Sequence, residues 1–388
     1  MKKILVAPQA FKGSISALDA AKASAEGILR VLPNCNVVLC PVADGGDGTL
    51  ETLVDISNGS IKTDSVTGPN GEAIEASWGA MGDGVSAVIE MARMSGLAII
   101  PIEDRNPLTA TTYGLGEIIS IALDEGFRKF IIGIGGSGTN DAGAGMAQAL
   151  GVKLLDIDGT DISFGGGPLV HLDSIDMSGI DPRIFESEFM IACDVSNPLI
   201  GAEGASTVYG PQKGATEKMV MELDNSLARF GEIVERTLNK KVTWIPGAGA
   251  AGGLGAGMIA FLNGQLKSGV DIVLDKVLLK DKLKGVDLVI TGEGSIDFQT
   301  IYNKAPIGVA KMAYSMGIPT VGIAGMLGKN YQVVHKDDGI KAVTSITQGP
   351  VTLKESSEAS YQLILESVEQ LVRFVEVGIG MQKGKPIK

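Results

Sequence analysis

The sequence predicts an α/β protein with two domains, on three observations. Short apolar runs bounded by glycine, proline and polar residues alternate with helix-length segments, which is typical of strands in a mainly parallel sheet. A hairpin pattern interrupts this alternation after about residue 60, and the parallel pattern returns near residue 285. The 388 residues, 45% of them hydrophobic, also exceed what one core usually fills, about 250–300 residues.

The first part of the chain predicts two strands, each followed by a helix. Residues 4–7 form an apolar run, and the segment 16–31 follows as a helix with Ser14 or Ser16 as its N-cap. A second run at 37–42 leads into a helix that ends near residue 56.

The middle part predicts a different architecture. Two strands at 61–66 and 73–78 flank Pro69, Asn70 and Gly71, which favour a turn, so we expect an antiparallel hairpin. Further strands are expected at 85–91, 130–134 and 190–193, and helices at 109–124, at 217–238 and up to residue 262.

The last part predicts a return to parallel strands and helices. We expect strands at 286–290 and 320–324, a helix starting near Pro306, and a terminal helix at 354–375. The predicted domains are therefore residues 1–60 with 285–388, and the insertion 61–284.

Charge and cysteine usage limit the class of protein. The formal net charge is −12 with no lysine or arginine run, which excludes nucleic acid and anionic membranes as expected partners. Cys35, Cys40 and Cys193 are an odd, unpatterned set in apolar runs and indicate reduced core residues. The N-terminal apolar run breaks at Pro8, too early for a signal peptide, so we expect a soluble cytoplasmic protein.

A glycine loop follows the expected strand at 130–134. Gly133, Gly135 and Gly138 match G-x-G-x-x-G, and Asp156 lies near the end of the next apolar run, as in a dinucleotide site. A second match at 247–252 lowers the weight of either one. The alternative is an anion-binding wall made by backbone N–H groups between Gly135 and Thr139, with Asp156 an ordinary turn residue.

Acidic side chains recur where expected strands end, which is the usual ligand edge of an open α/β sheet. Asp44 and Asp47 follow the strand at 37–42 and either hold Mg²⁺ or a hydroxyl, or only cap a helix and form a turn. Asp194 follows the strand at 190–193 and is placed to accept a proton or bind a metal. Glu293 and Asp297 follow the strand at 286–290.

Two lysines lie beside glycine residues in expected loops. Lys12 precedes the first helix, where it either binds an anion with the helix N-terminus or is an exposed loop lysine. Lys213 stands between glycines. His171 and His335 have no G-x-S-x-G elbow to serve, so structural or surface roles are expected.

Acids, scattered lysines and glycine loops without a redox residue favour phosphoryl transfer. There, a protein positions the phosphates, neutralises their charge with Mg²⁺ and supplies a carboxylate that accepts the substrate proton. No G-x-x-x-x-G-K-[ST] or protein-kinase motif set occurs. From the residues alone we therefore expect a small-molecule kinase.

An ordered set of segments then resembles the bacterial type I glycerate kinase family. The segments are PVADGGDGT (41–49), GIGGSGTNDAGAGMAQALG (133–151), ACDVSNPLIGAEGAS (192–206), GPQKGA (210–215), PGAGAAGGLGAG (246–257) and TGEGSIDFQ (291–299). The resemblance implies ATP- and Mg²⁺-dependent phosphorylation of D-glycerate, most often at the 2-hydroxyl. It also implies a flavodoxin-like domain formed by both chain ends, an unusual inserted α/β domain, and an active site in the cleft between them.

The expected roles follow from these segments. The catalytic residues are Asp194, the first choice for general base, Asp44, the second choice, and Lys12. The residues expected to bind substrate or phosphates are Ser14, Gly135, Gly136, Ser137, Asn140, Asp141, Asn197, Lys213, Gly252, Gly253 and Lys304. Mg²⁺ or the substrate hydroxyls are assigned to Asp47, Glu293 and Asp297.

Five positions depart from the family pattern. Gln9 and Ala10 stand where the family has aspartate and serine, Tyr113 where it has serine, Ser295 where it has arginine, and Asn303 where it has glycine. These changes remove recognition groups, each worth roughly 1.5–3 kcal/mol when charged. Three hypotheses follow: a glycerate kinase, a kinase of the same fold for another hydroxy acid, or a nucleotide-binding regulatory paralogue without turnover.

Overall fold

The structure, a computed structural model, describes residues 1–46, 48–302, 304–336 and 338–382. The chain divides into two compact units. Unit 1 comprises Met1–Asp44 and Val270–Lys388, and unit 2 comprises Gly45–Gly269. None of the described helices is long and apolar enough to span a membrane.

Unit 1 is a parallel five-stranded sheet with helices packed on it. The strand order is β13-β12-β11-β1-β2. The strands are β1 (Lys3–Pro8), β2 (Asn36–Leu39), β11 (Leu288–Ile296), β12 (Thr320–Leu327) and β13 (Ala342–Ser345). Numbered by their order within the unit, the strands run 2-1-3-4-5 across the sheet, which is the flavodoxin-like order and confirms the expected fold class.

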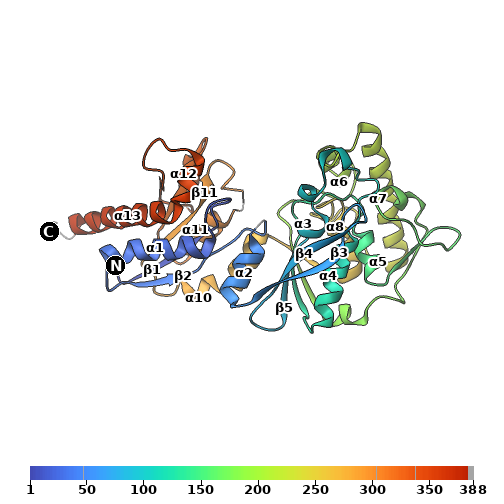
Figure 1. Cartoon of the computed structure of the whole chain (residues 1–388), viewed down its shortest axis with the longest axis horizontal. Coiled ribbons are helices and arrows are strands. Elements are labelled where there is room, and N and C mark those ends of the chain that lie inside the picture. Colours follow the sequence, from blue (N-terminus) through green and yellow to red (C-terminus); the bar gives the residue numbers. More distant parts are fainter. Residues whose placement is uncertain (47, 303, 337, 383–388) are drawn as a thin grey trace. The chain divides into compact units, whose positions relative to one another are not determined.

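The helices of unit 1 pack on this sheet and on each other, except that α12 buries no side chain. They are α1 (Ala17–Val31), α10 (Leu279–Lys282), α11 (Ala305–Ser315), α12 (Leu353–Glu358) and α13 (Ser360–Gln382). Helices α1 and α13 lie side by side (Figure 1), so close that a Cβ on Gly27 would lie 2.3 Å from the Leu365 carbonyl oxygen. Ser16 caps α1 by accepting from Asp19 N, whereas Ser14 does not. The single terminal helix expected at 354–375 is instead two helices, because α12 buries no side chain and ends before the apolar face of α13 begins.

Unit 2 contains a mixed six-stranded sheet in the order β10-β9-β6-β5-β4-β3. Its strands are β3 (Ser60–Thr67), β4 (Ala73–Ala80), β5 (Ser86–Glu90), β6 (Lys129–Gly133), β9 (Glu188–Ala192) and β10 (Gln265–Lys267). The expected hairpin is confirmed as β3 and β4, while β5, β6, β9 and β10 run parallel. A separate pair joins β7 (Lys153–Leu155) to β8 (Ser174–Asp176).

The helices of unit 2 surround a large apolar core. They are α2 (Thr49–Ser57), α3 (Ala92–Ser95), α4 (Tyr113–Asp124), α5 (Ala144–Ala149), α6 (Ala205–Tyr209), α7 (Glu217–Leu238) and α8 (Leu254–Leu262). The helix expected at 217–238 has those bounds and is capped by Thr216.

The unit boundaries lie earlier in the chain than the expected positions near 60 and 285. Helix α2 packs on β4 and β5, and Glu90 Oε1 accepts a hydrogen bond from Leu50 N, so the segment after Asp44 belongs to unit 2. Helix α9 (Gly269–Lys276) packs on α11, where a Cβ on Gly308 would lie 2.4 Å from Val270 Cγ1. That close packing assigns most of α9 to unit 1.

Candidate functional site

A cavity of about 440 Å³ lies in unit 2, beyond the carboxyl ends of the parallel neighbours β6 and β9. Its lining includes five residues that the sequence predicts as functional: Gly135, Gly136, Ser137, Asp194 and Lys213. The other lining residues are Gly45, Gly46, Leu97, Ile134, Ala192, Cys193, Val195, Tyr209, Gln212, Ala250 and Ala251. This position matches the general ligand edge of parallel strands.

The glycine loop after β6 is held by backbone contacts rather than by a following helix. Leu97 N donates to Gly136 O at 2.8 Å, and Gly138 N donates to Ser95 O at 2.9 Å. Gly136 has φ +73°, in the left-handed region that favours glycine. Helix α5 begins only at Ala144, so the loop does not open a helix as a dinucleotide fingerprint requires.

Asp156 accordingly has no ligand-facing role in the structure. Its Oδ1 accepts from Asp158 N at 3.0 Å and from Thr160 N at 2.9 Å, which makes it a turn residue. The dinucleotide interpretation is therefore not supported by the geometry. Of the anion wall expected from Gly135 to Thr139, Gly135, Gly136 and Ser137 line the cavity, whereas the Gly138 N–H already donates to Ser95 O.

Lys213 lines the cavity from a short 3₁₀ helix at Pro211–Lys213. Only 1% of the residue is exposed. Its Nζ donates to Ser137 Oγ at 2.7 Å and to Thr139 O at 2.6 Å. Burial lowers the pKa of this amine from 10.5 to about 7, although the nearby Asp141 opposes the shift.

Three groups beside Lys213 point to an anion site. No acceptor for the backbone N–H groups of Gly135 and Gly136, or for the hydroxyl hydrogen of Ser137, lies within the part of the chain that the structure describes. Unpaired backbone N–H groups in a loop favour an anion. Together with the ammonium group, they can neutralise a phosphate or a carboxylate.

Asp194 is the exposed carboxylate of the cavity. It follows β9 directly, and its Oδ1 accepts from Gly269 N at 3.1 Å, which orients the side chain. The preceding residue, Cys193, contributes a thiol to the lining, and burial raises its pKa.

Several predicted ligand residues instead serve the protein itself and do not line the cavity. Asp141 is fully buried; it accepts from Thr112 N and Thr112 Oγ1 at 2.8 Å, and from the N–H groups of Gly143 and Gly145. Burial, the larger effect, raises the Asp141 pKa, while these hydrogen bonds oppose that shift. This carboxylate ties the starts of α4 and α5 together.

Asn140, Asn197, Gly252 and Gly253 are likewise used for packing. Asn140 Nδ2 donates to Ser206 Oγ at 3.0 Å, and Asn197 accepts from Tyr209 Oη at 2.7 Å. A Cβ on Gly252 would lie 2.1 Å from Thr139 O, and Gly253 caps α8 with φ +88°. These residues support the walls around the cavity from behind.

A second cluster lies in unit 1, where β1 and β11 are neighbours. This is the switch point of the flavodoxin-like order, where such sheets bind ligands. Glu293 is 7% exposed; its Oε1 accepts from Thr300 Oγ1 at 3.0 Å, and its Oε2 lies 3.7 Å from Lys304 Nζ. Burial raises the Glu293 pKa to about 7, assisted by Asp44 and Asp297 and opposed by Lys304 and Thr300.

Among the described residues, no three His, Cys, Asp or Glu side chains are grouped to hold a metal ion by themselves. The Glu293 carboxylate already has Lys304 and Thr300 as partners, and Asp297 Oδ1 accepts from Gln299 N at 2.7 Å. Asp47, the other expected metal ligand, lies outside the described residues.

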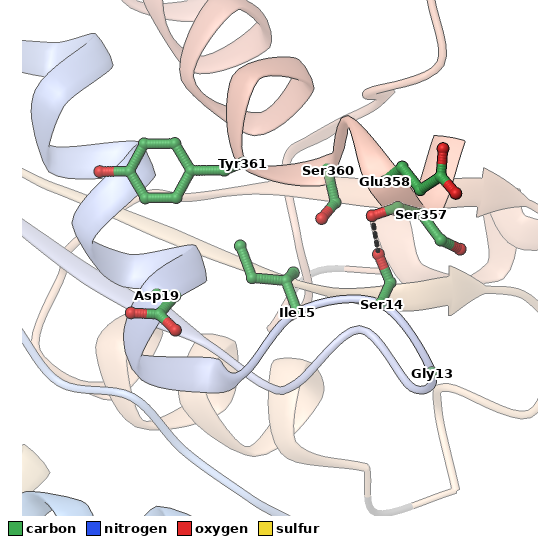
Figure 2. A pocket seen from close by; sticks show the side chains of 8 residues that line it. All are labelled: Gly13, Ser14, Ile15, Asp19, Ser357, Glu358, Ser360 and Tyr361. Carbon is green, nitrogen blue, oxygen red and sulfur yellow. Dashed lines mark hydrogen bonds between the residues drawn. The ribbon is translucent and has the colours of Figure 1, made fainter. Parts of the chain in front are cut away.

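Lys12 and Ser14 lie in the loop after β1. The Lys12 backbone approaches β11, because a Cβ on Gly294 would lie 3.5 Å from Lys12 N. Ser14 lines a separate hollow of about 590 Å³ between this loop and the α12–α13 turn, where its Oγ donates to Ser357 O at 3.4 Å (Figure 2). Asp19 and Glu358 also line this hollow, and their carboxylates disfavour an anion beside Ser14.

The departures from the family pattern occupy different environments. Gln9 N donates to Gly292 O at 2.8 Å, and its buried Oε1 has no partner among the described residues, so an acceptor lies unused beside the Glu293 strand. Tyr113 packs on Phe164 with ring centroids 5.0 Å apart. Ser295 pairs with Met326 on β12, and Asn303 lies outside the described residues.

Sequence reasoning missed some residues that the structure brings to these places. Tyr209, Gln212 and Cys193 line the cavity with Lys213, and Thr300 holds Glu293. Of these residues, only Gln212 could be identified from the sequence, because it precedes Lys213 in the GPQKGA segment. Ala10, which stands where the family has a serine, is half-buried in the segment that follows β1.

Comparison with known proteins gives one consistent result. The model of the Glycerate kinase family matches residues 4–376. A glycerate kinase of Halalkalibacterium halodurans is 50% identical over 371 residues, covering 96% of this chain and 97% of the relative. A glycerate 2-kinase of Escherichia coli K12 is 47% identical over 377 residues, covering 97% and 99%. A crystal structure of a candidate glycerate kinase 2 from Salmonella typhimurium LT2 superposes with a TM-score of 0.90 at 44% identity, covering 97% of this chain and 99% of that one.

Proposed function

Because this chain belongs to the glycerate kinase family and is therefore a kinase, we propose that it transfers the γ-phosphoryl group of ATP to D-glycerate, giving 2-phosphoglycerate and ADP. The observation that carries the proposal is the unit 2 cavity, which combines a buried ammonium group, backbone N–H groups that have no acceptor among the described residues, and an oriented carboxylate. Phosphoryl transfer needs these parts: charge neutralisation, positioning and a proton acceptor.

The proposed chemistry assigns Asp194 as the general base. As the 2-hydroxyl oxygen of glycerate forms its bond to the γ-phosphorus, the bond from that phosphorus to the bridging oxygen of ADP breaks. The hydroxyl proton passes to the Asp194 carboxylate, which Gly269 N–H orients at 3.1 Å. Lys213, Ser137 and the N–H groups of Gly135 and Gly136 neutralise the phosphate charge.

The unit 1 cluster is proposed to bind an anionic or hydroxyl group of a substrate through Lys304, Lys12 and Glu293. Asp44 is the alternative base at this cluster. The described residues contain no group of three metal-ligand side chains. We therefore propose that Mg²⁺ enters with the phosphates of ATP. Mg²⁺ is usually bound in this way, through one or two carboxylates together with the substrate phosphates.

Another small hydroxy acid is the second candidate acceptor, favoured by Gln9 and Ala10, which stand where the resemblance places an aspartate and a serine. The loss of an acid and a hydroxyl changes the hydrogen bonds that a substrate could form at this loop. The test is ADP release by the purified protein over a panel of hydroxy acids, with ³¹P NMR of the product. Turnover with D-glycerate and a 2-phosphate signal are expected; turnover with another acid alone replaces D-glycerate as the acceptor.

A further inference from the structure

The lining of the unit 2 cavity combines polar and apolar groups. The polar groups are the Lys213 ammonium, the Ser137 hydroxyl, the glycine N–H groups described above, the Asp194 carboxylate, and the side chains of Tyr209 and Gln212. The apolar side chains of the lining are those of Leu97, Ile134, Ala192, Val195, Ala250 and Ala251. A ligand that fills the cavity must therefore have a charged part and a sizeable apolar part.

The size of the cavity points the same way. At about 440 Å³ it falls within the roughly 300–1,000 Å³ typical of sites for drug-sized ligands. A three-carbon hydroxy acid is small and polar throughout, so it would leave most of the space unfilled and its hydroxyls unpaired against apolar walls. A nucleotide has both required parts, since its base is flat and largely apolar on its faces and its phosphates are anionic.

We propose that this cavity is the nucleotide site, with the phosphates beside Lys213 and Ser137 and the base against the apolar walls, and that the hydroxy acid meets this cavity only at the Asp194 carboxylate. The assignment rests on the proposed kinase function and says which of the two substrates unit 2 holds. Lys213 and Ser137 then contact the nucleotide phosphates, while Leu97, Val195 and the alanines contact its base.

Gly135 provides a direct probe of this site. A Cβ on Gly135 meets no atom within 4 Å, and its φ lies outside the left-handed region, so a side chain there enters open space without straining the loop. Gly135→Ala and Gly135→Leu should fold normally and fill the phosphate end to increasing degrees. Gly378→Ala is the matched control, because Gly378 on α13 is exposed and its Cβ also meets no atom within 4 Å.

The first experiment measures the binding of ADP and of D-glycerate separately by calorimetry, using full-length proteins. Gly135→Leu should raise the Kd of ADP by about tenfold or more, Gly135→Ala by less, and Gly378→Ala not at all, while the Kd of D-glycerate stays the same. A loss of D-glycerate binding with unchanged ADP binding overturns the assignment. Unchanged binding of both ligands also overturns it.

The second experiment needs no mutation. Cys193 lines the cavity, whereas Cys35 lies in unit 1 and serves as an internal reference. Alkylation of each thiol by iodoacetamide is followed by mass spectrometry at pH 9. ADP or ATP alone should slow labelling of Cys193 at least about fivefold and leave Cys35 unchanged, and D-glycerate alone should slow labelling of Cys193 by less than about twofold. Protection by D-glycerate but not by nucleotide, or by neither, overturns the assignment. Failure of the proposed reaction would appear separately, as absent wild-type turnover with D-glycerate while nucleotide protection persists.

Discussion

The Nζ atom of Lys213 donates a hydrogen bond of 2.7 Å to Oγ of Ser137, so the GPQKGA segment fixes a hydroxyl of the glycine loop after β6. A second bond of 2.6 Å to Thr139 O holds the loop backbone as well. An ammonium group has three N–H bonds, and these two contacts use two of them. The third bond is available to a ligand anion in the cavity that both residues line.

Replacing Lys213 by methionine should reduce kcat/KM for ATP by about 10- to 150-fold, since a hydrogen bond to a charged group contributes roughly 1.5–3 kcal/mol. Steady-state kinetics would show the loss mainly as a higher KM for ATP. Lys240→Met is a matched control, because Lys240 Nζ also binds carbonyl oxygens, those of Ile259 and Ala260, but does not line the cavity. Equal kinetic losses in both variants would mean that Lys213 acts only through stability.

Nucleotide binding should be accompanied by proton uptake at pH 8. Burial lowers the Lys213 pKa to about 7, so most of this amine is neutral at pH 8 before the ligand binds. A bound phosphate favours the ammonium form and raises that pKa, so the complex gains up to one proton. Calorimetry in two buffers of different ionisation enthalpy measures the uptake. The Lys213→Met variant should show none, and equal uptake by the variant would place the titrating group elsewhere.

How far the sequence predicts this site can be judged from its polar residues. Strand ends and glycine loops selected Gly135, Ser137, Asp194 and Lys213, and the structure brings these four residues into one cavity, because parallel strands end on one side of a sheet. The same logic also selected Asp141, which turns inward to backbone N–H groups. Local sequence does not tell whether such a side chain lines the cavity or binds the protein backbone, because the partners of Asp141 include Thr112, which is 29 residues away in the chain.

The fold was more predictable than the unit boundaries for a related reason. The turn residues Asn70 and Gly71 specify the β3–β4 hairpin locally, and Thr216 specifies the start of α7. Whether α2 packs on unit 1 or unit 2 depends instead on its contacts with β4 and β5, which follow it in the chain. Nothing in the α2 segment itself encodes that choice.

Replacing Asp194 by asparagine should lower kcat by about 10²- to 10⁴-fold while the Kd of ADP stays within about twofold of the wild-type value. An amide keeps the hydrogen bond from Gly269 N but no longer accepts a proton. Rapid-quench measurement of the chemical step would locate the loss. Asp156→Asn is the control, because that turn aspartate does not line the cavity. Wild-type rates in Asp194→Asn would transfer the role to Asp44.

Replacing Glu293 by glutamine should stabilise the protein at pH 8 by roughly 1–3 kcal/mol, a range discounted for its incomplete burial. Burial raises the folded-state pKa of Glu293 from 4.5 to about 7, so the folded protein favours the protonated acid. The stability this group contributes is full below pH 4.5 and is lost as the pH rises through 7. Glutamine resembles the neutral acid and removes that loss.

Denaturant titrations between pH 4.5 and 8 should therefore show that the free energy of unfolding of the variant increases relative to that of the wild type as the pH rises. Glu358→Gln, at an exposed position, should leave the pH profile unchanged. A constant difference between Glu293→Gln and wild type across this range would show that the carboxyl group stays ionised, held by Lys304 at 3.7 Å.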